Sequence, residues 1–581
     1  MPAIAKNTTG PAAELLAFRQ SITPLLKRAV GFTALISLLS LAPALYMFEV
    51  YDRVINSLNV TTLLMLTLLL LGLLALMELL EWVRGQILHE GGLILENQLG
   101  DRVFDAVFAA NLIQPTGSTQ ALNDLRTLRE FLPSPALTAI LDAPTATFFL
   151  ILLFLIHPAL GAFALVLAAA QVYVAYLTER TTNPPLTEAN RMAIAAQTNA
   201  SNSLRNAQAI EAMGMLPHVT QRWMGLQRRF LGKQAEASDH AGGKGALAKA
   251  LQQTLSSGLL GLSAWLLLQN ELPGGGAMLI VASILGGKTL APLVQVISGW
   301  KQVVGARLAW ARLDELLRQA PARRAGMPLP PPLGNLSVEG VIAGAPGTQA
   351  AILRGVSFQL PAGKCLIVVG PSAAGKTTLA RVLTGVWPTI AGKVRLDGVD
   401  VHAWNKAELG PHLGYLPQDI ELFEGTLAEN IARFGEVDMA KVEAAARLVG
   451  LHETILALPA GYDSRIGEEG AFLSGGQRQR VGLARAIYGN PRFVVLDEPN
   501  SNLDEAGDAA LLATLQHLKA QGTTLVVVSH RTSVLPVADA MLVLRDGQAV
   551  AFGPRDEVLA ALTQPRTPVQ ATPGAAAVAQ A

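Results

Sequence analysis

Residues 370–378 have the composition and spacing of a loop that holds the phosphates of a nucleotide. They read GPSAAGKTT, fit the pattern G-x-x-x-x-G-K-[ST], and follow the apolar run CLIVVG directly. Glycines in such a loop let backbone N–H groups approach phosphate oxygens, and the next helix adds the positive end of its dipole. Lys376 can reach the β- and γ-phosphates, and the Thr377 hydroxyl can bind magnesium. The predicted cradle consists of Gly370, Pro371, Ser372, Ala373, Ala374, Gly375, Lys376, Thr377 and Thr378.

A second segment supplies carboxylates that suit phosphate chemistry. In RFVVLDEPNSNLD, the apolar residues 493–496 predict a buried strand that delivers Asp497 and Glu498 at its end. Asp497 suits a magnesium ion, and Glu498 suits the activation of an attacking water. Further on, VVVSHR places His530 at the end of another apolar strand, where it can sense a γ-phosphate. Taken alone, His530 is equally compatible with an ordinary strand end.

These groups need a sheet to position them. From about residue 335, short apolar runs alternate with helix-forming segments, and the runs include CLIVVG, RFVVLDEP, TTLVVVSH and AMLVLRDG. That alternation predicts an α/β domain with a buried, largely parallel sheet. The lone cysteine, Cys365, lies in the first run and is interpreted as a buried strand residue without a redox or metal role.

The first half of the chain has the composition of a membrane domain. The 581-residue protein has only 15% charged residues, and its mean hydropathy is +0.36. Helices of about 20 mostly apolar residues can cross a hydrocarbon core of about 30 Å. We expect six spans, with a turn at His157 and Pro158 separating the third from the fourth. They lie near residues 30–50, 60–80, 136–156, 158–177, 250–268 and 276–297.

Basic residues predict how these spans are oriented. Four of them precede the first span and nine lie between the fourth and fifth, whereas the opposite loops hold only Arg53. Cytoplasmic loops carry the excess of Lys and Arg, so both termini and the α/β domain are expected in the cytoplasm. A net charge of +1 without a basic stripe gives no reason to expect nucleic acid as a partner.

The segment LSGGQRQRVGLARA, residues 473–486, resembles the signature loop of the ABC ATPases. The phosphate loop, LDEP, the SNLD loop and the glutamine of GYLPQD also occur in the order of that superfamily. The roles that this resemblance implies are phosphate binding for Lys376 and Ser372; magnesium or its water for Thr377, Gln418 and Asp497; general base for Glu498; and γ-phosphate contact for His530.

In that superfamily the signature loop covers the nucleotide of a partner domain. The resemblance therefore implies that Ser474, Gly475, Gly476 and Gln477 contact ATP held by another subunit. Ser474, Gly476 and the N-terminus of the following helix can supply donors for an anionic γ-phosphate. Because the chain has one such domain, we expect a homodimer.

One element departs from the superfamily pattern. Most relatives stack adenine on an aromatic residue upstream of the phosphate loop, but LSVEGVIAGAPGTQAAILRGV contains no aromatic residue. We expect an aliphatic residue such as Val341 or Ile342 to contact adenine instead. Base selectivity should then be weak, and GTP should be tolerated.

The order of membrane half and ATPase resembles the ABC exporters. Long segments, above all MFEVYDRV, resemble the permease–ATPase subunits of bacterial type I secretion systems, in the branch that exports metalloproteases, lipases or haem-binding proteins. The resemblance implies ATP-driven export of an unfolded protein with an uncleaved C-terminal signal, hydrolysis of Mg2+-ATP, and a place in the bacterial inner membrane. It also implies a periplasmic membrane-fusion adaptor and an outer-membrane channel protein as partners, besides the secreted cargo and membrane lipid.

The expected fold is therefore multi-domain, with an all-α six-helix transmembrane domain of the exporter type followed by an α/β P-loop nucleotide-binding domain. The predicted boundaries are 1–28 for a cytoplasmic segment, 29–318 for the transmembrane domain with cytoplasmic extensions, 319–334 for a Pro-rich linker, 335–562 for the ABC ATPase and 563–581 for a disordered tail.

Two other functions use similar features. A lipid or small-amphipath exporter would share the same ATPase, and an ATP-gated regulator without transport would be expected to lack catalytic residues. Charged residues in the predicted spans, or at the outer end of the first one, do not decide between them. Glu49, Asp52, Arg53, Asp142 and Lys288 are expensive in lipid and should face water or one another, either on a transport path or as ordinary interhelical pairs.

Overall fold

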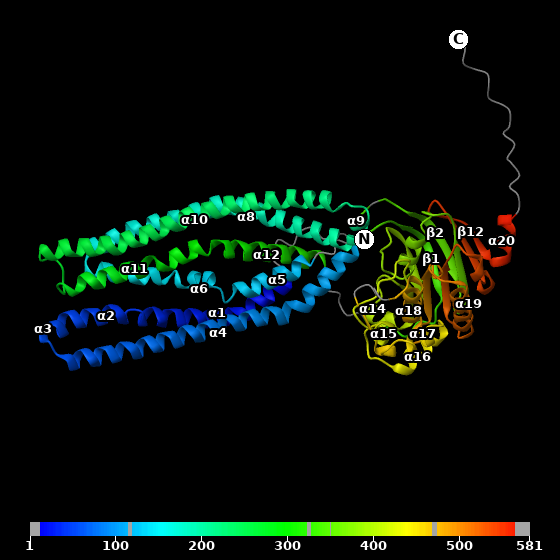
Figure 1. The fold of residues 1–581 in the computed structure, drawn as a ribbon, viewed down its shortest axis with the longest axis horizontal. Helices are drawn as coiled ribbons and strands as arrows, with labels where there is room; N and C mark the ends of the chain where they lie inside the picture. Colours follow the sequence, from blue (N-terminus) through cyan, green and yellow to red (C-terminus); the bar gives the residue numbers. More distant parts are fainter. Residues whose placement is uncertain (1–11, 114–118, 322–326, 349, 468–472, 564–581) are drawn as a thin grey trace, which may run out of the picture. The chain divides into compact units, whose positions relative to one another are not determined.

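The structure is a computed structural model that describes residues 12–113, 119–321, 327–348, 350–467 and 473–563. The chain divides into two compact units. One contains the helices α1 to α12, and the other contains the strands and the helices α13 to α20 (Figure 1). Apart from Thr563, the predicted tail lies outside the described residues.

The first unit consists of helices alone among its described residues. Several are far longer than a membrane is thick, because α4, α8 and α10 continue past the predicted spans as expected. The helices are α1 (Ala13–Leu39), α2 (Ala42–Glu49), α3 (Ile55–Ser57), α4 (Val60–Ile113), α5 (Gln120–Phe131), α6 (Pro135–Asp142), α7 (Thr145–Ile156), α8 (Pro158–Arg205), α9 (Ala207–Ala212), α10 (Leu216–Leu268), α11 (Ala277–Ser298) and α12 (Trp300–Gln319).

The first predicted span is not one straight helix over residues 30–50. α1 begins well upstream and ends at Leu39, and α2 starts anew with Pro43 in its first turn. Proline lacks the N–H that would continue the preceding helix, which explains this break. A π-helix then occupies Val50–Val54, inside MFEVYDRV. The Tyr51 ring of this π-helix packs on Gly276, where an added Cβ would lie 3.1 Å from Tyr51 Cε1.

The predicted turn between the third and fourth spans is confirmed. α7 ends at Ile156 and α8 begins at Pro158. The His157 side chain caps the new helix, because its Nδ1 accepts a hydrogen bond from the Ala159 N–H at 3.2 Å.

Among the described residues, four helices are long and apolar enough to cross a membrane, or five if the bent pair α6–α7 counts as one span. The difference from the six predicted spans lies in α10. Residues 250–268 are helical there, but Gln252 and Gln253 make that segment less apolar than the other spans.

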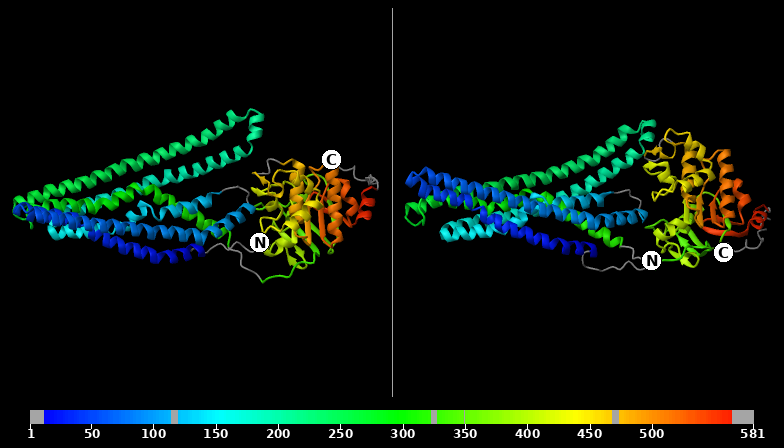
Figure 2. Two further views of the ribbon diagram at one scale, coloured as in Figure 1. Left: turned by 60° about the horizontal axis from the view of Figure 1, so that its bottom comes forward. Right: turned by 90° about the horizontal axis from the view of Figure 1, so that it is seen from below.

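The long helices α8 and α10 lie side by side and are joined through the short α9. In both views of Figure 2 they separate from the other helices of this unit toward the α9 end. The chain around α9 exposes apolar side chains, including Leu204 at 75% and Met213 at 66% exposure.

Three of the five charged residues singled out in and beside the spans are paired with neighbours. The Arg84 guanidinium of α4 donates to Asp142 of α6 at 2.6 Å and to the Thr33 hydroxyl of α1 at 3.1 Å. Arg53 and Glu49 form an ion pair at 2.7 Å on consecutive turns. The expectation that the charges meet other polar groups is therefore confirmed for Glu49, Arg53 and Asp142, although the sequence did not identify Arg84 as a partner.

The second unit contains a parallel sheet flanked by helices and by an antiparallel sheet. The first sheet has the order β12-β11-β3-β10-β9-β6, in which every pair except β11–β12 is parallel. The second has the order β2-β1-β4-β5. The strands are β1 (Leu336–Ala343), β2 (Leu353–Leu360), β3 (Cys365–Val369), β4 (Ala391–Leu396), β5 (Val399–Asp400), β6 (Leu413–Leu416), β7 (Gly425–Thr426), β8 (Arg465–Ile466), β9 (Phe493–Asp497), β10 (Thr524–Val528), β11 (Ala540–Arg545) and β12 (Gln548–Pro554).

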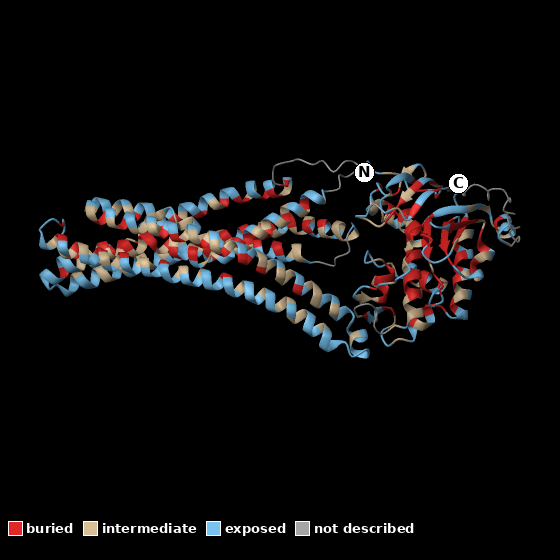
Figure 3. Cartoon of the chain, turned by 90° about the horizontal axis from the view of Figure 1, so that it is seen from above, coloured by how far each residue is buried: buried red, intermediate tan, exposed pale blue. Residues whose placement is uncertain are grey.

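The parallel sheet is the core of this unit. Every residue of β9 and β10 is buried, and Figure 3 shows buried positions concentrated in the sheet region of this unit. The helices that bear on the site are α13 (Lys376–Leu383), α18 (Gly475–Ile487) and α19 (Glu505–Ala520). Strands buried on both faces read as continuous apolar runs, which is why the sequence located β3, β9, β10 and β11.

Candidate active site

Four neighbouring parallel strands bring the predicted site residues to one edge of the sheet. β3 leads into the phosphate loop, β9 ends at Asp497, β10 leads to His530, and β6 leads to Gln418. The carboxyl ends of parallel strands meet at the same edge, so side chains far apart in the sequence converge there. The second unit therefore builds its chemistry at the position where open α/β sheets bind ligands.

The phosphate loop has a backbone that only glycine permits at two positions. A Cβ at Gly370 would lie 2.2 Å from the Leu544 carbonyl oxygen, and Gly375 has a φ of +97° beside Leu353. No side chain caps the helix that starts at Lys376. Its first N–H groups therefore remain available to an anion, as the sequence predicts.

The remaining residues of this loop divide into an exposed and a buried set. Pro371, Ser372 and Ala373 are exposed, and Ala373 has a positive φ of 64°. Ala374 and Thr378 are buried at 2% and 7% exposure. The first three can face a ligand, whereas the last two support the loop from beneath.

Lys376 closes over its own loop. Its Nζ donates to the carbonyl oxygens of Gly370 at 2.9 Å and Pro371 at 3.0 Å. Burial lowers the pKa of Lys376, while the charges of Glu498 and Asp497 act in the opposite direction. The ammonium is thus held where a phosphate can replace the two carbonyls.

The predicted catalytic side chains form a continuous chain of contacts. The Thr377 hydroxyl donates to Gln418 Oε1 at 3.3 Å, and Gln418 Nε2 donates to Glu498 Oε2 at 3.3 Å. His530 Nε2 lies 3.2 Å from Glu498 Oε1. Glu498 also has a φ of +49°, an unfavourable conformation for a non-glycine residue and one that is frequent at functional sites.

Asp497 has the environment of a cation ligand. It is 0% exposed, and neither carboxylate oxygen has a hydrogen-bond partner among the described residues. The Thr377 hydroxyl donates to Gln418 instead. Burial raises the pKa of Asp497. A buried carboxylate without donors is costly unless a cation binds it, so Asp497, Thr377 and Gln418 fit Mg2+.

One residue of this network was missed from the sequence. Gln479 of α18 is 0% exposed, and its Nε2 donates to the Glu498 carbonyl at 3.1 Å. Its Oε1 accepts from Ser501 at 3.4 Å and from Asn502 at 3.3 Å. Gln479 therefore ties the signature helix to the backbone of Glu498. Its position two residues after LSGGQ was the available signal.

The signature residues lie apart from the site of their own chain. Among the described residues, no hydrogen bond or ion pair joins Ser474, Gly475, Gly476 or Gln477 to residues 370–378. Ser474 and Gln477 instead form a capping box: the Gln477 N–H donates to Ser474 Oγ at 3.2 Å, and the Ser474 N–H donates to Gln477 Oε1 at 2.9 Å. Both glycines pack near Asn502.

The expected adenine contact through Val341 is wrong. Val341 is 0% exposed because the pairing of β1 with β2 shifts register around it, and the shift turns its side chain inward. Ile342 is half-buried. Ile352, which precedes β2, is 36% exposed and lies against the phosphate loop, 3.4 Å from a Cβ built on Gly375. Ile352 is therefore an exposed aliphatic side chain beside the phosphate loop.

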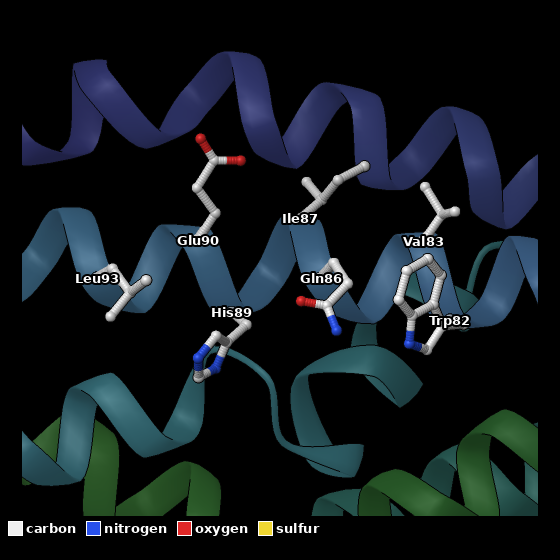
Figure 4. Close-up of a pocket in the computed structure, with 7 residues that line it drawn as sticks. All are labelled: Trp82, Val83, Gln86, Ile87, His89, Glu90 and Leu93. Atoms are coloured by element: carbon white, nitrogen blue, oxygen red, sulfur yellow. The ribbon is translucent and has the colours of Figure 1, made fainter.

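A hollow of about 330 Å³ also lies on α4 in the first unit. Figure 4 shows its lining residues, among them Trp82, His89 and Glu90. All of them belong to this one helix and project in different directions along it. The hollow is a surface groove without converging groups, unlike the edge of the parallel sheet.

Comparison with known families matches residues 353–501 to the ABC transporter family and residues 29–287 to the ABC transporter transmembrane region. A type I secretion system ATP-binding protein, PrsD of Rhizobium meliloti (strain 1021), is 40% identical over 538 residues, which cover 92% of each protein. The cyclolysin secretion/processing ATP-binding protein CyaB of Bordetella pertussis is 27% identical over 92% of this chain and 76% of that protein.

Two further similarities are broader. An ATP-dependent lipid A-core flippase of Chromohalobacter salexigens is 32% identical over 62% of this chain and 64% of that protein. In fold, the chain resembles a bacterial Atm1-family ABC exporter with ATP bound, with a TM-score of 0.79 and 24% identity over 93% of this chain and 97% of that one. With a transmembrane region, an ATP-binding domain and a relative such as PrsD over nearly its whole length, this chain belongs to the ABC transporters and is related to the ATP-binding proteins of type I secretion systems.

Proposed function

We propose that this protein is the inner-membrane ATPase of a type I secretion system and exports an unfolded polypeptide with an uncleaved C-terminal signal. The observation that carries the proposal is the similarity to PrsD over 92% of both proteins, which includes the membrane helices as well as the ATPase. The contacts among Thr377, Gln418, Glu498 and His530 support hydrolysis rather than passive nucleotide binding. These contacts argue against a regulator that lacks catalytic activity.

ATP would lie along the sheet edge, with its phosphates on residues 370–378 and Lys376. Mg2+ held by Thr377, Gln418 and Asp497 would neutralise phosphate charge when bound. Glu498 would take a proton from the attacking water, and His530, 3.2 Å from it, would contact the γ-phosphate. Gln479 would keep Glu498 in place through its carbonyl.

The functional form would be a homodimer with two composite sites. Among the described residues, no hydrogen bond or ion pair joins the signature residues Ser474, Gly475, Gly476 and Gln477 to residues 370–378 of their own chain. They are therefore available to complete the site of a second copy, where the N-terminus of α18 would face the γ-phosphate. Closure of two such sites would draw the ATPase units together and move the membrane helices.

The proposed location is the bacterial inner membrane, with the N-terminus and the ATPase in the cytoplasm. The distribution of basic residues supports this orientation. A periplasmic membrane-fusion adaptor and an outer-membrane channel protein would complete the route. A metalloprotease, lipase or haem-binding protein would be the kind of cargo.

The test is to measure the ATPase rate of the purified protein in lipid discs against C-terminal peptides of secreted proteins encoded in the same genome. Stimulation by a C-terminal peptide, but not by a scrambled peptide of the same composition, is expected. The flippase relative makes lipid export the second candidate. Stimulation by lipid A-type lipids and by none of the peptides would replace protein export with that function.

A further inference from the structure

Lys288 is a positive charge near the middle of a membrane span. It lies on α11, which runs from Ala277 to Ser298 over 22 residues (Figure 1). At 1.5 Å per residue it is about 15 Å from either end of that helix. A lysine side chain near the end of a span can extend to the interface, but one at this depth cannot. Its ammonium therefore needs polar surroundings within the membrane.

No side chain in the described part of the same chain supplies them. Among the residues that the structure describes, Lys288 has neither an ion pair nor a hydrogen bond through its side chain. The acidic residues Glu49 and Asp142 are already paired, with Arg53 and Arg84 respectively. An unpaired charge in a span marks a functional position or a water-filled cavity.

The backbone at Lys288 also needs polar surroundings. Pro292, four residues later, lies inside α11. Proline has no N–H, so the Lys288 carbonyl lacks its normal helical donor. A carbonyl left free in hydrocarbon is costly unless water or another polar group reaches it. One residue thus combines a free ammonium with a freed carbonyl.

The exposed positions of α11 are polar, unlike those in the first part of α4. The only exposed residues of α11 are Gln295 and Ser298, and Gln295 lies two turns beyond half-buried Lys288 on the same side of the helix. In the first part of α4, by contrast, the exposed side chains are mostly leucines, including Leu64 at 56% and Leu69 at 60%. The exposed positions of α11 thus do not form an apolar face like that of α4.

We propose that Lys288 lines the water-filled path through the membrane and that its ammonium binds carboxylates of the extended cargo as the cargo crosses. This inference rests on the proposed function, because it needs a polypeptide in the path. An exported chain carries side-chain carboxylates and one terminal carboxylate, and either can bind an ammonium. In the homodimer, two copies of Lys288 would present two such groups to one chain.

Access to water is tested first by thiol labelling. Cys365, the single cysteine, is 0% exposed, and burial raises its pKa to about 12, so the native chain is an unreactive background. Lys288→Cys and Gln295→Cys should react with a charged, water-soluble thiol reagent in lipid discs. Leu68→Cys, on the leucine face of α4, should not. Failure of Lys288→Cys to react while Gln295→Cys reacts would overturn the proposed position of Lys288.

Binding of carboxylates is tested by peptide-stimulated ATPase activity. We expect Lys288→Met to raise the peptide concentration for half-maximal stimulation by about tenfold, as for loss of a hydrogen bond to a charged group. Lys288→Arg should preserve it. Lys301→Met is the matched control, because Lys301 is an exposed lysine on the next helix, α12. Thermal unfolding of each variant separates binding from folding.

Peptide chemistry then identifies the carboxylate. If an amidated C-terminus raises the half-maximal peptide concentration for wild type but not for Lys288→Met, the terminal carboxylate binds Lys288. If Asp→Asn or Glu→Gln substitutions in the peptide have this effect instead, side-chain carboxylates bind Lys288. An unchanged half-maximal concentration in Lys288→Met, with wild type stimulated, would overturn this inference alone. Absence of stimulation in wild type by any peptide would instead overturn the proposed function.

Discussion

The ATPase unit has two glycine-containing loops that each start a helix, and they satisfy their helix ends in opposite ways. At α13 no side chain caps the helix, and the preceding Gly375 is left-handed. At α18 the Ser474 and Gln477 side chains form a capping box. The first loop leaves donors free and stands beside Asp497, so it is built around a ligand. The second loop has its helix end capped by its own side chains, so it keeps its conformation without a nucleotide from its own chain.

The comparison predicts that the proton transfer of ATP hydrolysis takes place at the sheet edge beside the first loop. Glu498→Gln should retain ATP but reduce hydrolysis by about 10² to 10⁴, the range for loss of a general base. Phosphate release and retention of radiolabelled ATP measure the two effects. Wild-type turnover in this variant would remove Glu498 from its proposed role and break the distinction between the loops.

Mixed dimers test whether the second loop serves another copy. Ser474→Arg on one chain and Lys376→Ala on the other leave one intact composite site if the loops act between chains. ATPase activity of up to half the wild-type value is then expected, whereas either variant alone as a homodimer should be nearly inactive. If the signature loop served its own chain, the mixed dimer would be as inactive as the homodimers.

Asp497 tests whether the site at the first loop favours ligand binding over the stability of the nucleotide-free protein. Because burial raises its pKa, Asp497 binds its proton more tightly in the folded than in the unfolded chain. Nucleotide-free stability should therefore fall as the pH rises from below about 4, the usual value for Asp. Asp497→Asn should remove this fall, raise stability at pH 7 by about 1 kcal/mol, and abolish Mg2+-dependent hydrolysis.

Asp539 is the matched control for that measurement. Burial opposes its charge, but the Lys519 ammonium at 2.8 Å and the Cys365 N–H at 2.9 Å outweigh burial and lower its pKa. Its contribution to stability is present above the usual pKa and is lost as the pH falls. Asp539→Asn should therefore destabilise the protein at pH 7. Differential scanning calorimetry of both variants across pH would contradict the argument if the two shifts had the same sign.

The smallest expected effect concerns adenine. Ile352→Ala removes apolar surface beside Gly375 and should weaken ATP binding by about fivefold, as for roughly 1 kcal/mol of lost burial. GTP binding should weaken similarly, because an aliphatic side chain does not distinguish the bases. Titration with fluorescent nucleotides measures both affinities. A larger effect from Ile342→Ala would restore the original prediction for β1, and strict ATP preference in wild type would refute tolerance of GTP.

The site residues at the edge of the parallel sheet were predictable because each is marked by residues next to it in the sequence. Each functional residue follows an apolar run that is long enough for one buried strand, as with Asp497 after β9 and His530 after β10. Parallel pairing then brings the strand ends together without further information. The expected contact through Val341 failed for the opposite reason: the bulge that accompanies its burial depends on the pairing of β1 with β2 and β4, which the residues of β1 alone do not show.

The membrane half was predictable in composition but not in detail. Hydrophobic stretches located the helices, and the turn at His157 followed from Pro158. The break before Pro43 has a local cause that the prediction overlooked, whereas nothing in the sequence around Glu49 predicted the π-helix that follows it. Arg84 was overlooked because its partner Asp142 lies in another helix.

The π-helix at Val50–Val54 has an implication for how this protein tolerates insertions and deletions. Such a segment is equivalent to one extra residue accommodated within an α-helix. Each residue turns an α-helix by about 100°. Deleting a single residue here would restore regular α-helical winding. It would also rotate Tyr51 away from Gly276, the residue that directly precedes α11. The contact between this helix end and Gly276 should therefore be lost on deletion of a single residue.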